Sequence, residues 1–295
     1  MKLPYLPPIE SQHGHKVDDL TLYVHLLMIA LFVGWSLYFL YAIWRFRKGR
    51  NPKADYVGTT AHTSSAVEVA VALVEGVLLF GLAIPMWANS VDKFPDPKAS
   101  TVLRITGRQF NWVARYPGAD GVFGKQDVGL VTGDNPMGLI AKDPKLKNTD
   151  TNGFDDVLLE SGEIAVPVNK VVHLLITSND VIHSWTIPSF GSKQQAVPGR
   201  VTATWFQATR EGVYYGQCSV LCGRNHSAMP IAVRVVKDDV FAAWVAAIKD
   251  RKPKEARKLL LAATAGIEPR TFAELPGHLT ADGLTAGAAP TDAAN

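Results

Sequence analysis

The residues best suited to chemistry lie in one short stretch that begins at Cys218 and ends at Met229. It holds the only two cysteines of the chain, Cys218 and Cys222, together with the imidazole of His226 and the thioether of Met229. Sulfur ligands combined with imidazole suit copper, and a weak methionine ligand beside such a set is typical of copper electron-transfer sites. One further histidine from a distant segment, His183, would give enough ligands for a pair of copper ions.

The two cysteines admit two simpler interpretations. In an oxidising compartment Cys218 and Cys222 could form a disulfide, but such a bridge has no use for His226 and Met229. A zinc site could use two cysteines and two histidines, yet it gains nothing from a methionine. The spacing therefore favours copper over both alternatives.

Two apolar blocks near the N-terminus predict a pair of membrane spans. The first block, Thr21 to Trp44, contains no Lys, Arg, Asp or Glu, and at ~1.5 Å per residue it is long enough to cross a ~30 Å hydrocarbon core. The second block, Val67 to Ala88, is apolar except for Glu68 and Glu75. We therefore expect a polar N-terminal tail over residues 1–20 and a transmembrane helical hairpin over residues 21–90.

The connection between the two blocks sets the orientation of the hairpin. It carries five cations within residues 45–53, against a single acid at Asp55, and such a basic connection marks the cytoplasmic side. The N-terminal tail and everything after residue 90 should then face the periplasm. The first block lacks the short basic region of a secretory signal, so we expect it to remain as an uncleaved span.

From Thr101 onward the sequence changes to short runs rich in Val, Ile, Thr and aromatic residues, separated by Gly and Pro, which predict an antiparallel β-sandwich or barrel over residues 96–236. A polar stretch over residues 117–156 interrupts these runs and is expected to be a solvated insertion. Residues 237–295 should form a C-terminal extension, with helices over 238–250 and 254–263 and a tail disordered from about residue 280. The net charge of +3 is small and scattered, which argues against nucleic-acid binding.

The copper ligands belong to a larger pattern. The chain carries His183-Ser184-Trp185, then Pro198-Gly199-Arg200, then the spacing Cys-x-x-x-Cys-Gly-x-x-His-x-x-Met from Cys218. With these residues it resembles subunit II of the haem-copper respiratory oxidases, the cytochrome c oxidases, in register from about residue 20 to about residue 236. The resemblance implies a membrane-anchored all-β protein, in which a two-helix transmembrane hairpin is followed by a cupredoxin-like Greek-key β-barrel.

The resemblance also implies roles for the ligands of a binuclear copper (CuA) centre. Cys218 and Cys222 would bridge both ions, His183 and His226 would each bind one copper, and Met229 would be a weak outer ligand. The backbone oxygen of residue 220 completes the set, and the Val220 side chain does not affect it. The family commonly has a glutamate at position 220 that helps to bind magnesium or manganese at the subunit interface. Valine offers no oxygen for a hard cation, so this chain should contribute no side chain to that site.

Comparison with the family pattern also suggests roles for four further residues. Phe110 stands where the family has the tryptophan at which electrons enter from cytochrome c, and Trp112 keeps the second tryptophan of that aromatic run as another possible entrance. Glu68 matches the family glutamate at the mouth of a proton pathway into subunit I. Glu75 departs from the family pattern. It could extend a proton path or form a hydrogen bond to a helix of the partner, and we favour the second role.

The function implied is the electron-input subunit of a proton-pumping terminal oxidase in the respiratory chain, located in the bacterial inner membrane. Electrons would pass from a c-type cytochrome through two copper ions to haem in subunit I, where oxygen is reduced to water. The chain has no Cys-x-x-Cys-His motif, so it should carry no covalent haem of its own. Its partners would be subunit I, other oxidase subunits, the donor cytochrome and the lipid membrane. The alternatives are a copper-free quinol oxidase subunit, a membrane-tethered copper-delivery protein, and the copper subunit of another respiratory reductase.

Overall fold

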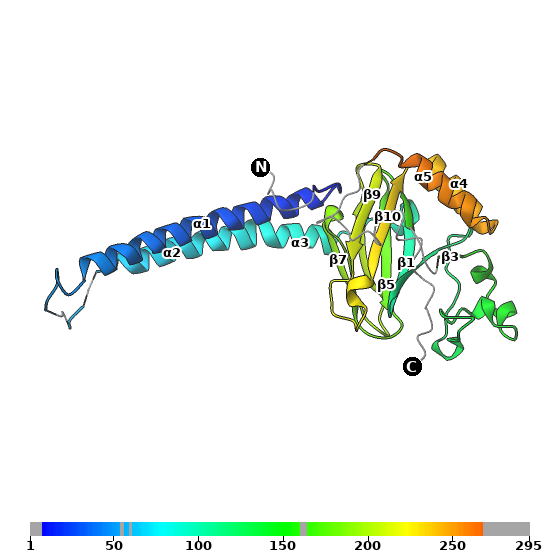
Figure 1. Cartoon of the computed structure of the whole chain (residues 1–295), viewed down its shortest axis with the longest axis horizontal. Helices are drawn as coiled ribbons and strands as arrows, with labels where there is room; N and C mark the ends of the chain where they lie inside the picture. Colours follow the sequence, from blue (N-terminus) through cyan, green and yellow to red (C-terminus); the bar gives the residue numbers. More distant parts are fainter. Residues whose placement is uncertain (1–7, 54–55, 59–60, 160–163, 268–295) are drawn as a thin grey trace. The chain divides into compact units, whose positions relative to one another are not determined.

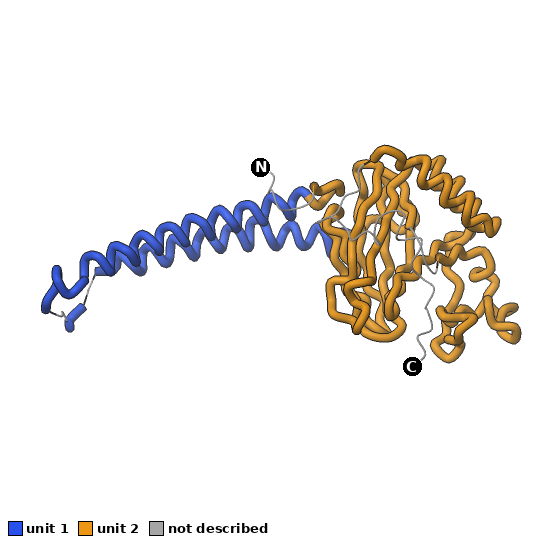
Figure 2. Tube along the Cα trace, in the orientation of Figure 1, with its two compact units in different colours: residues 1–4, 15–93 blue, residues 5–14, 94–295 orange. Residues whose placement is uncertain are grey.

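The computed structural model describes residues 8–53, 56–58, 61–159 and 164–267. These residues form two compact units, which are coloured separately in Figure 2. The first unit comprises residues 15–93, and the second comprises residues 8–14 together with 94–267. The disorder expected from about residue 280 lies outside the described residues.

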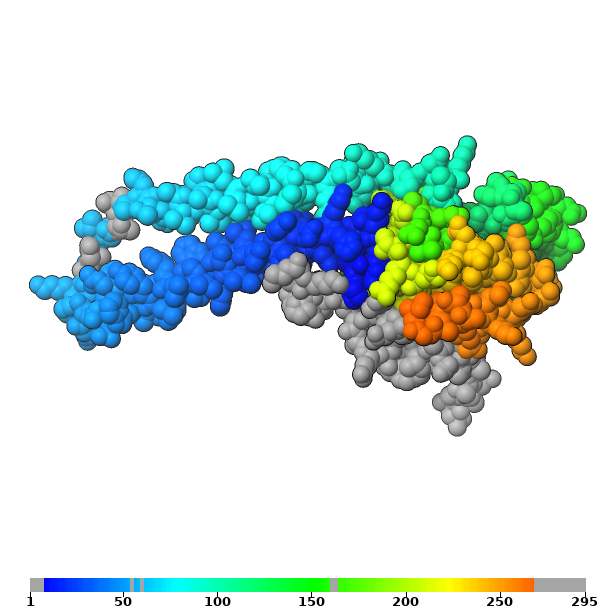
Figure 3. Space-filling model, turned by 90° about the horizontal axis from the view of Figure 1, so that it is seen from above, coloured from blue at the N-terminus to red at the C-terminus, as the bar shows by residue number. Residues whose placement is uncertain are grey.

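The first unit is a hairpin of two long apolar helices, which lie side by side in Figures 1 and 3. One helix is α1 (Gly14–Arg45), and the other runs through α2 (Thr63–Gly76), the π-helix η1 (Val77–Ala83) and α3 (Ile84–Val91). With 32 and 29 residues, both are long and apolar enough to span a membrane. Large apolar side chains such as Phe32 and Phe80 are exposed along them, as expected of helices that face lipid.

The helices differ from the sequence-based expectation in two details. Helix α1 begins at Gly14, several residues before Thr21, because Ser11 Oγ accepts a hydrogen bond from the Gly14 amide and closes the first turn. The second helix is π-helical directly before Pro85, whose ring lacks an N–H and cannot follow a regular α-helical turn. The irregular part of this span therefore coincides with the proline.

The second unit is a β-sandwich. One sheet has the order β3 (Val157–Leu159), β2 (Asn111–Tyr116), β1 (Thr101–Arg108), β5 (Val171–Ser178) and β8 (Thr202–Gln207). The other has the order β4 (Ile164–Pro167), β10 (Pro230–Val236) and β9 (Gly212–Gln217), and a separate hairpin is formed by β6 (His183–Ile187) and β7 (Ser192–Ala196). A helical hairpin followed by a mostly-β domain is the fold class that the sequence predicts.

The strand pairing corrects one part of that prediction. The sheets are not wholly antiparallel, because β1 pairs in parallel with β5 and β4 pairs in parallel with β10. These strands are far apart in the sequence, and parallel pairs require such long connections. The periodicity of the strands reports which residues face the core, but it carries no information on strand direction.

The core lies between the sheets. Along β5 the alternate residues Val172, Leu174 and Ile176 are buried, and they join Leu103 and Ile105 of the neighbouring strand β1 in one apolar cluster. This alternation is the period-two pattern of a strand with one face in the core. The cluster extends to Cys218, Cys222 and Met229, so these candidate ligands are packed into the apolar core of the domain.

The insertion over residues 117–156 is ordered without regular strands. It contains the short 3-10 turns η3 (Val128–Leu130), η4 (Ile140–Lys142), η5 (Lys147–Thr149) and η6 (Thr151–Phe154). Its carboxylates accept bonds from backbone amides: Asp150 Oδ2 lies 2.7 Å from the Lys125 nitrogen, and Asp156 Oδ2 lies 2.9 Å from the Gly124 nitrogen. Side chains therefore replace the backbone pairing that secondary structure would provide.

The C-terminal extension begins with two helices that cover one end of the sandwich, α4 (Asp238–Lys249) and α5 (Pro253–Ala263) (Figure 1). Trp244 of α4 is buried and packs edge-on against Tyr116 at a centroid distance of 5.4 Å, and Leu260 of α5 joins the same core. Each of the two helices therefore buries a large apolar side chain in the core of the domain.

Candidate metal centre

Two segments bring the candidate ligands together. His183 is the first residue of β6, and the loop from Cys218 to Met229 joins β9 to β10. The Ser219 amide donates to the Ser184 carbonyl at 3.1 Å, and the Cys218 amide donates to the Met229 carbonyl at 3.2 Å. These two bonds fix the start of the loop against β6 and close its two ends on each other.

All six expected ligand atoms lie in one cluster. The Sγ atoms of Cys218 and Cys222 are 3.9 Å apart, and Cys218 Sγ lies 4.0 Å from His183 Nδ1 and 3.2 Å from the Val220 carbonyl oxygen. Around the second sulfur, Cys222 Sγ lies 3.5 Å from His226 Nδ1 and 3.8 Å from Met229 Sδ. One histidine nitrogen is therefore beside each sulfur, with the carbonyl oxygen on one side of the pair and the thioether on the other.

The donor set fits copper better than either alternative. Both cysteines are free thiols, and their sulfurs are separated by far more than the ~2.05 Å of a disulfide bond. A separation of 3.9 Å still allows one metal ion to contact both sulfurs at a metal–sulfur distance of about 2.3 Å. The thioether of Met229, 1% exposed, faces the cluster, and a soft ligand of this kind suits copper and not zinc.

Burial favours the protonated form of the Cys222 thiol when no metal is bound. Desolvation, together with the neighbouring Cys218 sulfur, raises the pKa of Cys222 to about 11. At neutral pH the Cys222 thiol must therefore lose its proton when a metal binds, because only the thiolate is an effective ligand.

His183 is oriented by a carboxylate that the sequence analysis did not identify. Asp180 Oδ1 lies 2.8 Å from His183 Nε2, so the other ring nitrogen, Nδ1, is left to face the sulfurs. Burial acts to raise the pKa of Asp180, but hydrogen bonds from His183, Gln109 and Val181 outweigh it and hold the pKa below its usual range. The result is a carboxylate–histidine pair of the kind that fixes metal-ligating imidazoles.

Gln109 is the second residue that the sequence analysis missed. Its backbone amide donates to Asp180 Oδ2 at 2.6 Å, and its side-chain amide donates to the Cys222 carbonyl at 2.6 Å. One residue thus supports both the histidine segment and the cysteine loop. The sequence gives one indication that Gln109 is important, which is its position next to Phe110 in the aromatic run. Its hydrogen-bond partners could not be predicted, because they lie 71 and 113 residues away in the sequence.

Two glycines allow these segments to approach. A Cβ atom on Gly107 would lie 2.9 Å from the His183 ring and 3.1 Å from the Trp112 ring. Gly223 has a φ of +140°, and a Cβ atom there would lie 2.7 Å from Gln109 Nε2 and 2.9 Å from the Phe110 ring. Both positions require glycine, because a side chain would displace either the histidine or the support of the cysteine loop.

The two aromatic candidates for electron input lie in different environments. Phe110 is half-buried, and its ring borders Gly223 in the cysteine loop. Trp112 is only 7% exposed and lies edge-on to His183 and Trp185, at centroid distances of 5.8 and 5.3 Å. Trp112 therefore offers a donor protein little contact area, although it touches a candidate ligand. Trp185 and Tyr215 are both buried.

The remaining candidates are outside the cluster. The Val220 side chain is half-buried and carries no oxygen, so it has no atom with which to bind magnesium or manganese. Glu68 and Glu75 are both on α2 and exposed in this chain. The Ser64 hydroxyl donates to Glu68 Oε1 at 2.8 Å, one helical turn away.

Comparison with known proteins agrees with this geometry. Residues 101–236 match the sequence profile described as cytochrome c oxidase subunit II, periplasmic domain. Cytochrome c oxidase subunit 2 of Cereibacter sphaeroides is 36% identical over 247 residues, which cover 82% of this chain and 78% of that protein. The alternative cytochrome c oxidase subunit 2 of Bradyrhizobium diazoefficiens is 32% identical over 244 residues, covering 81% and 82%.

Among solved structures, the periplasmic domain of subunit II of cytochrome oxidase from Bradyrhizobium japonicum is 36% identical. The match covers 53% of this chain and 97% of that domain, with a TM-score of 0.38.

Proposed function

Because this chain belongs to the cytochrome c oxidase subunit II family, we propose that it is the subunit through which electrons enter a haem-copper terminal oxidase. The observation that carries the proposal is the cluster of two free thiols, two imidazoles, a thioether and a carbonyl oxygen around Cys218 and Cys222. A disulfide, a zinc site or a quinol-oxidising relative would have no use for this complete set of soft ligands.

The ligand set supports a pair of copper ions. When bound, such a pair would accept and release one electron at a time. Cys218, Cys222, His183 Nδ1 and His226 Nδ1 would hold the two ions, and Met229 Sδ and the Val220 carbonyl oxygen would complete the ligand set. Buried ligands that are fixed in advance need little movement when the charge of the centre changes, which favours rapid electron transfer.

Electrons from a c-type cytochrome would enter near Phe110. Its half-buried ring offers a contact face, and Gln109 links the same segment to the Cys222 carbonyl. Trp112 is enclosed in the core and is the weaker candidate for donor contact. Within residues 96–236 the sequence contains 12 acidic and 14 basic residues, so the domain has no overall acidic field to attract a basic cytochrome. Local contacts at the Phe110 face must therefore select the donor.

The helical hairpin supplies the membrane anchor, and the match to a periplasmic domain agrees with its orientation. The basic connection would lie on the cytoplasmic side of a bacterial inner membrane, and the β-sandwich on the periplasmic side. Glu68, early in α2, would stand at the mouth of a proton pathway that continues in haem-bearing subunit I. Glu75 would bond to a helix of that partner, because a carboxylate within a span normally faces protein or water.

The proposal can be tested with the complex purified from membranes. We expect two copper ions per chain together with haem, and we expect Cys222→Ser to abolish cytochrome c oxidation while membrane insertion is retained. Ser227→Ala is the matched control, because Ser227 is exposed in the same loop and should leave oxidation unchanged.

Each alternative function predicts a different content of copper and haem, or a different reaction, for the purified complex. Copper without haem would indicate a copper-delivery protein, and haem without copper would indicate a quinol oxidase. Haem and copper with reduction of a nitrogen oxide in place of oxygen would indicate another respiratory reductase. Unchanged cytochrome oxidation by Cys222→Ser would reject the assigned electron path.

A further inference from the structure

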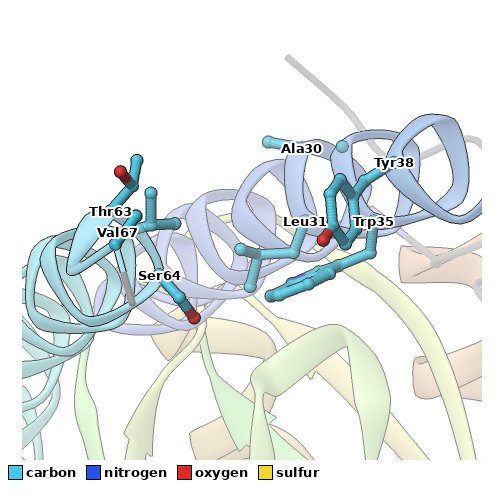
Figure 4. Close-up of a pocket in the computed structure, with 9 residues that line it drawn as sticks. Ala30, Leu31, Trp35, Tyr38, Thr63, Ser64 and Val67 are labelled. Atoms are coloured by element: carbon cyan, nitrogen blue, oxygen red, sulfur yellow. The ribbon is translucent and has the colours of Figure 1, made fainter. Parts of the chain in front are cut away.

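An apolar groove runs between the two helices of the hairpin (Figure 4). Its volume is about 630 Å³, and α1 contributes the large side chains Leu31, Trp35 and Tyr38. The facing wall includes Val67 of α2, and Tyr38, Thr63 and Ser64 are the lining residues that carry a hydroxyl group. The full lining comprises Ala30, Leu31, Gly34, Trp35, Tyr38, Ala61, Thr63, Ser64 and Val67. The groove is therefore suited to a hydrocarbon chain and poorly suited to a charged solute.

The helix that lines the groove continues into the basic connection. Five exposed cations follow one another from the end of α1: Arg45, Arg47, Lys48, Arg50 and Lys53. The Arg50 guanidinium lies 3.8 Å from the centroid of the Trp44 ring, and Arg45 lies 5.4 Å from that of Phe46. Aromatic rings and arginines in contact at the end of a span are typical of the membrane–water interface. This segment is therefore a concentrated site for anionic groups at the membrane surface.

The spacing between the groove and the cations matches the dimensions of one lipid leaflet. Ten residues separate Trp35 in the groove from Arg45, which at ~1.5 Å per residue is about 15 Å along α1. Half of a ~30 Å hydrocarbon core is also about 15 Å. A lipid whose phosphate lies beside Arg45 can therefore place its acyl chain along Trp35 and Leu31.

We propose that the hairpin binds one anionic phospholipid of the inner leaflet, with an acyl chain in the groove and the phosphate among the cations of residues 45–53. The inference is independent of the copper chemistry, and it takes from the proposed function only that this connection faces the inner leaflet. Charge complementarity selects the occupant, because a zwitterionic lipid would fill the groove equally well but would gain far less from five cations. The carboxylate of Glu68 accepts a bond from Ser64 on the groove wall, so an anionic head group is disfavoured there and is directed to the connection.

The test uses the intact complex, washed free of lipid and then titrated with phosphatidylglycerol or phosphatidylcholine of identical acyl chains. Native mass spectrometry counts the lipid bound per complex. The head-group variant combines Arg45→Gln, Arg47→Gln and Arg50→Gln. At roughly fivefold per cation, it should bind phosphatidylglycerol on the order of 100-fold more weakly while its binding of phosphatidylcholine is unchanged.

A second variant tests the groove itself. Gly34 lies in the groove wall, and a Cβ atom there would meet nothing within 4 Å, so Gly34→Leu fills the groove without a clash at Cβ. It should weaken the binding of both lipids by at least tenfold. Gly76→Leu is the matched control, since Gly76 has equally open surroundings but is not part of the groove, and its lipid binding should equal that of the wild type.

Two results would overturn the proposal. One is equal affinity of the wild type for the two lipids, which would show that the cations do not select the occupant. The other is unchanged phosphatidylglycerol binding by Gly34→Leu together with loss of subunit I, which would show that a partner helix fills the groove. Copper content and cytochrome oxidation are measured on the same samples. If a complex lacks copper or does not oxidise cytochrome c while its lipid binding is as expected, the result counts against the proposed electron-transfer function. It does not count against the lipid site.

Discussion

Asp180 and His183 form the contact on which the geometry of the cluster depends, with 2.8 Å between Oδ1 of the carboxylate and Nε2 of the imidazole. The histidine side chain is fully buried and the aspartate side chain is 31% exposed, so the pair connects the cluster with the protein surface. Because Nε2 is engaged, only Nδ1 remains for a metal. The carboxylate thereby fixes both the tautomer and the ring orientation of one expected copper ligand.

Replacing Asp180 with alanine should weaken copper binding by about 10- to 100-fold, because the His183 ring loses its orienting partner. Asp180→Asn should reduce the copper affinity much less, since the amide oxygen of asparagine can still accept a hydrogen bond from His183 Nε2. Copper affinity is measured by competition with a chelator, and Asp239→Ala, at an exposed position on α4, serves as the control. Equal affinities of wild type and Asp180→Ala would contradict the orienting role.

Copper binding should become stronger as the pH rises. The raised pKa of Cys222, about 11, means that the metal-free site holds this proton throughout the neutral range, and copper must displace it. For each proton that copper displaces, the copper affinity rises tenfold per pH unit. This thiol alone therefore predicts about 100-fold tighter copper binding at pH 8 than at pH 6. Chelator competition at several pH values, corrected for the protonation of the chelator, checks the slope. An affinity independent of pH would show that the thiol is already ionised.

The insertion should depend on the buried ion pair between Arg115 and Asp156. Arg115 Nε lies 2.9 Å from Asp156 Oδ2, and the two side chains are 1% and 2% exposed. Arg115→Met should lower the free energy of unfolding by about 3–5 kcal/mol, because it leaves the buried carboxylate without its partner. Asp156→Leu in the same chain should restore much of this loss, since no buried charge then remains.

Thermal unfolding of the purified full-length protein in detergent measures these changes. The matched control is Lys170→Met, which removes an exposed ion pair with Asp238 in which both side chains are more than half exposed. That change should cost less than about 1 kcal/mol. If Arg115→Met lowers the free energy of unfolding by no more than Lys170→Met does, the buried ion pair contributes no more to stability than a surface pair.

Phe110→Trp should make the complex react several-fold faster with a basic cytochrome c. The Phe110 ring borders Gly223 in the cysteine loop, so a larger aromatic surface there would extend the donor contact close to Cys222. Stopped-flow oxidation of reduced cytochrome c gives the rate constant. Phe154→Trp, at an exposed position in the insertion, should leave the rate unchanged. A slower reaction of Phe110→Trp would mean that the phenyl ring is itself the preferred contact.

Much of the molecule follows from local sequence patterns. Long apolar runs predict the two apolar helices, and runs rich in β-branched and aromatic residues predict β1, β2, β4, β5, β8, β9 and β10. The spacing of Cys218, Cys222, His226 and Met229 predicts one cluster. Strand β6, which begins at His183, was not predicted, because it is short and its pairing with β7 depends on register and not on periodicity. The ordered structure of the insertion was also not predicted, because carboxylate-to-backbone bonds leave no periodic pattern in a sequence.

Residue types and their spacing are enough to identify the side chains that could bind copper, and they place four of these side chains on one loop. The packing of the strands selects the nitrogen of His183 that faces the sulfurs, and it brings Asp180 and Gln109 to the site. The physical reason is the distance along the chain: Gln109 reaches across 71 residues to Asp180 and across 113 residues to the Cys222 carbonyl. Contacts of this length are set by how strands pair and pack, and no local pattern of residues encodes them.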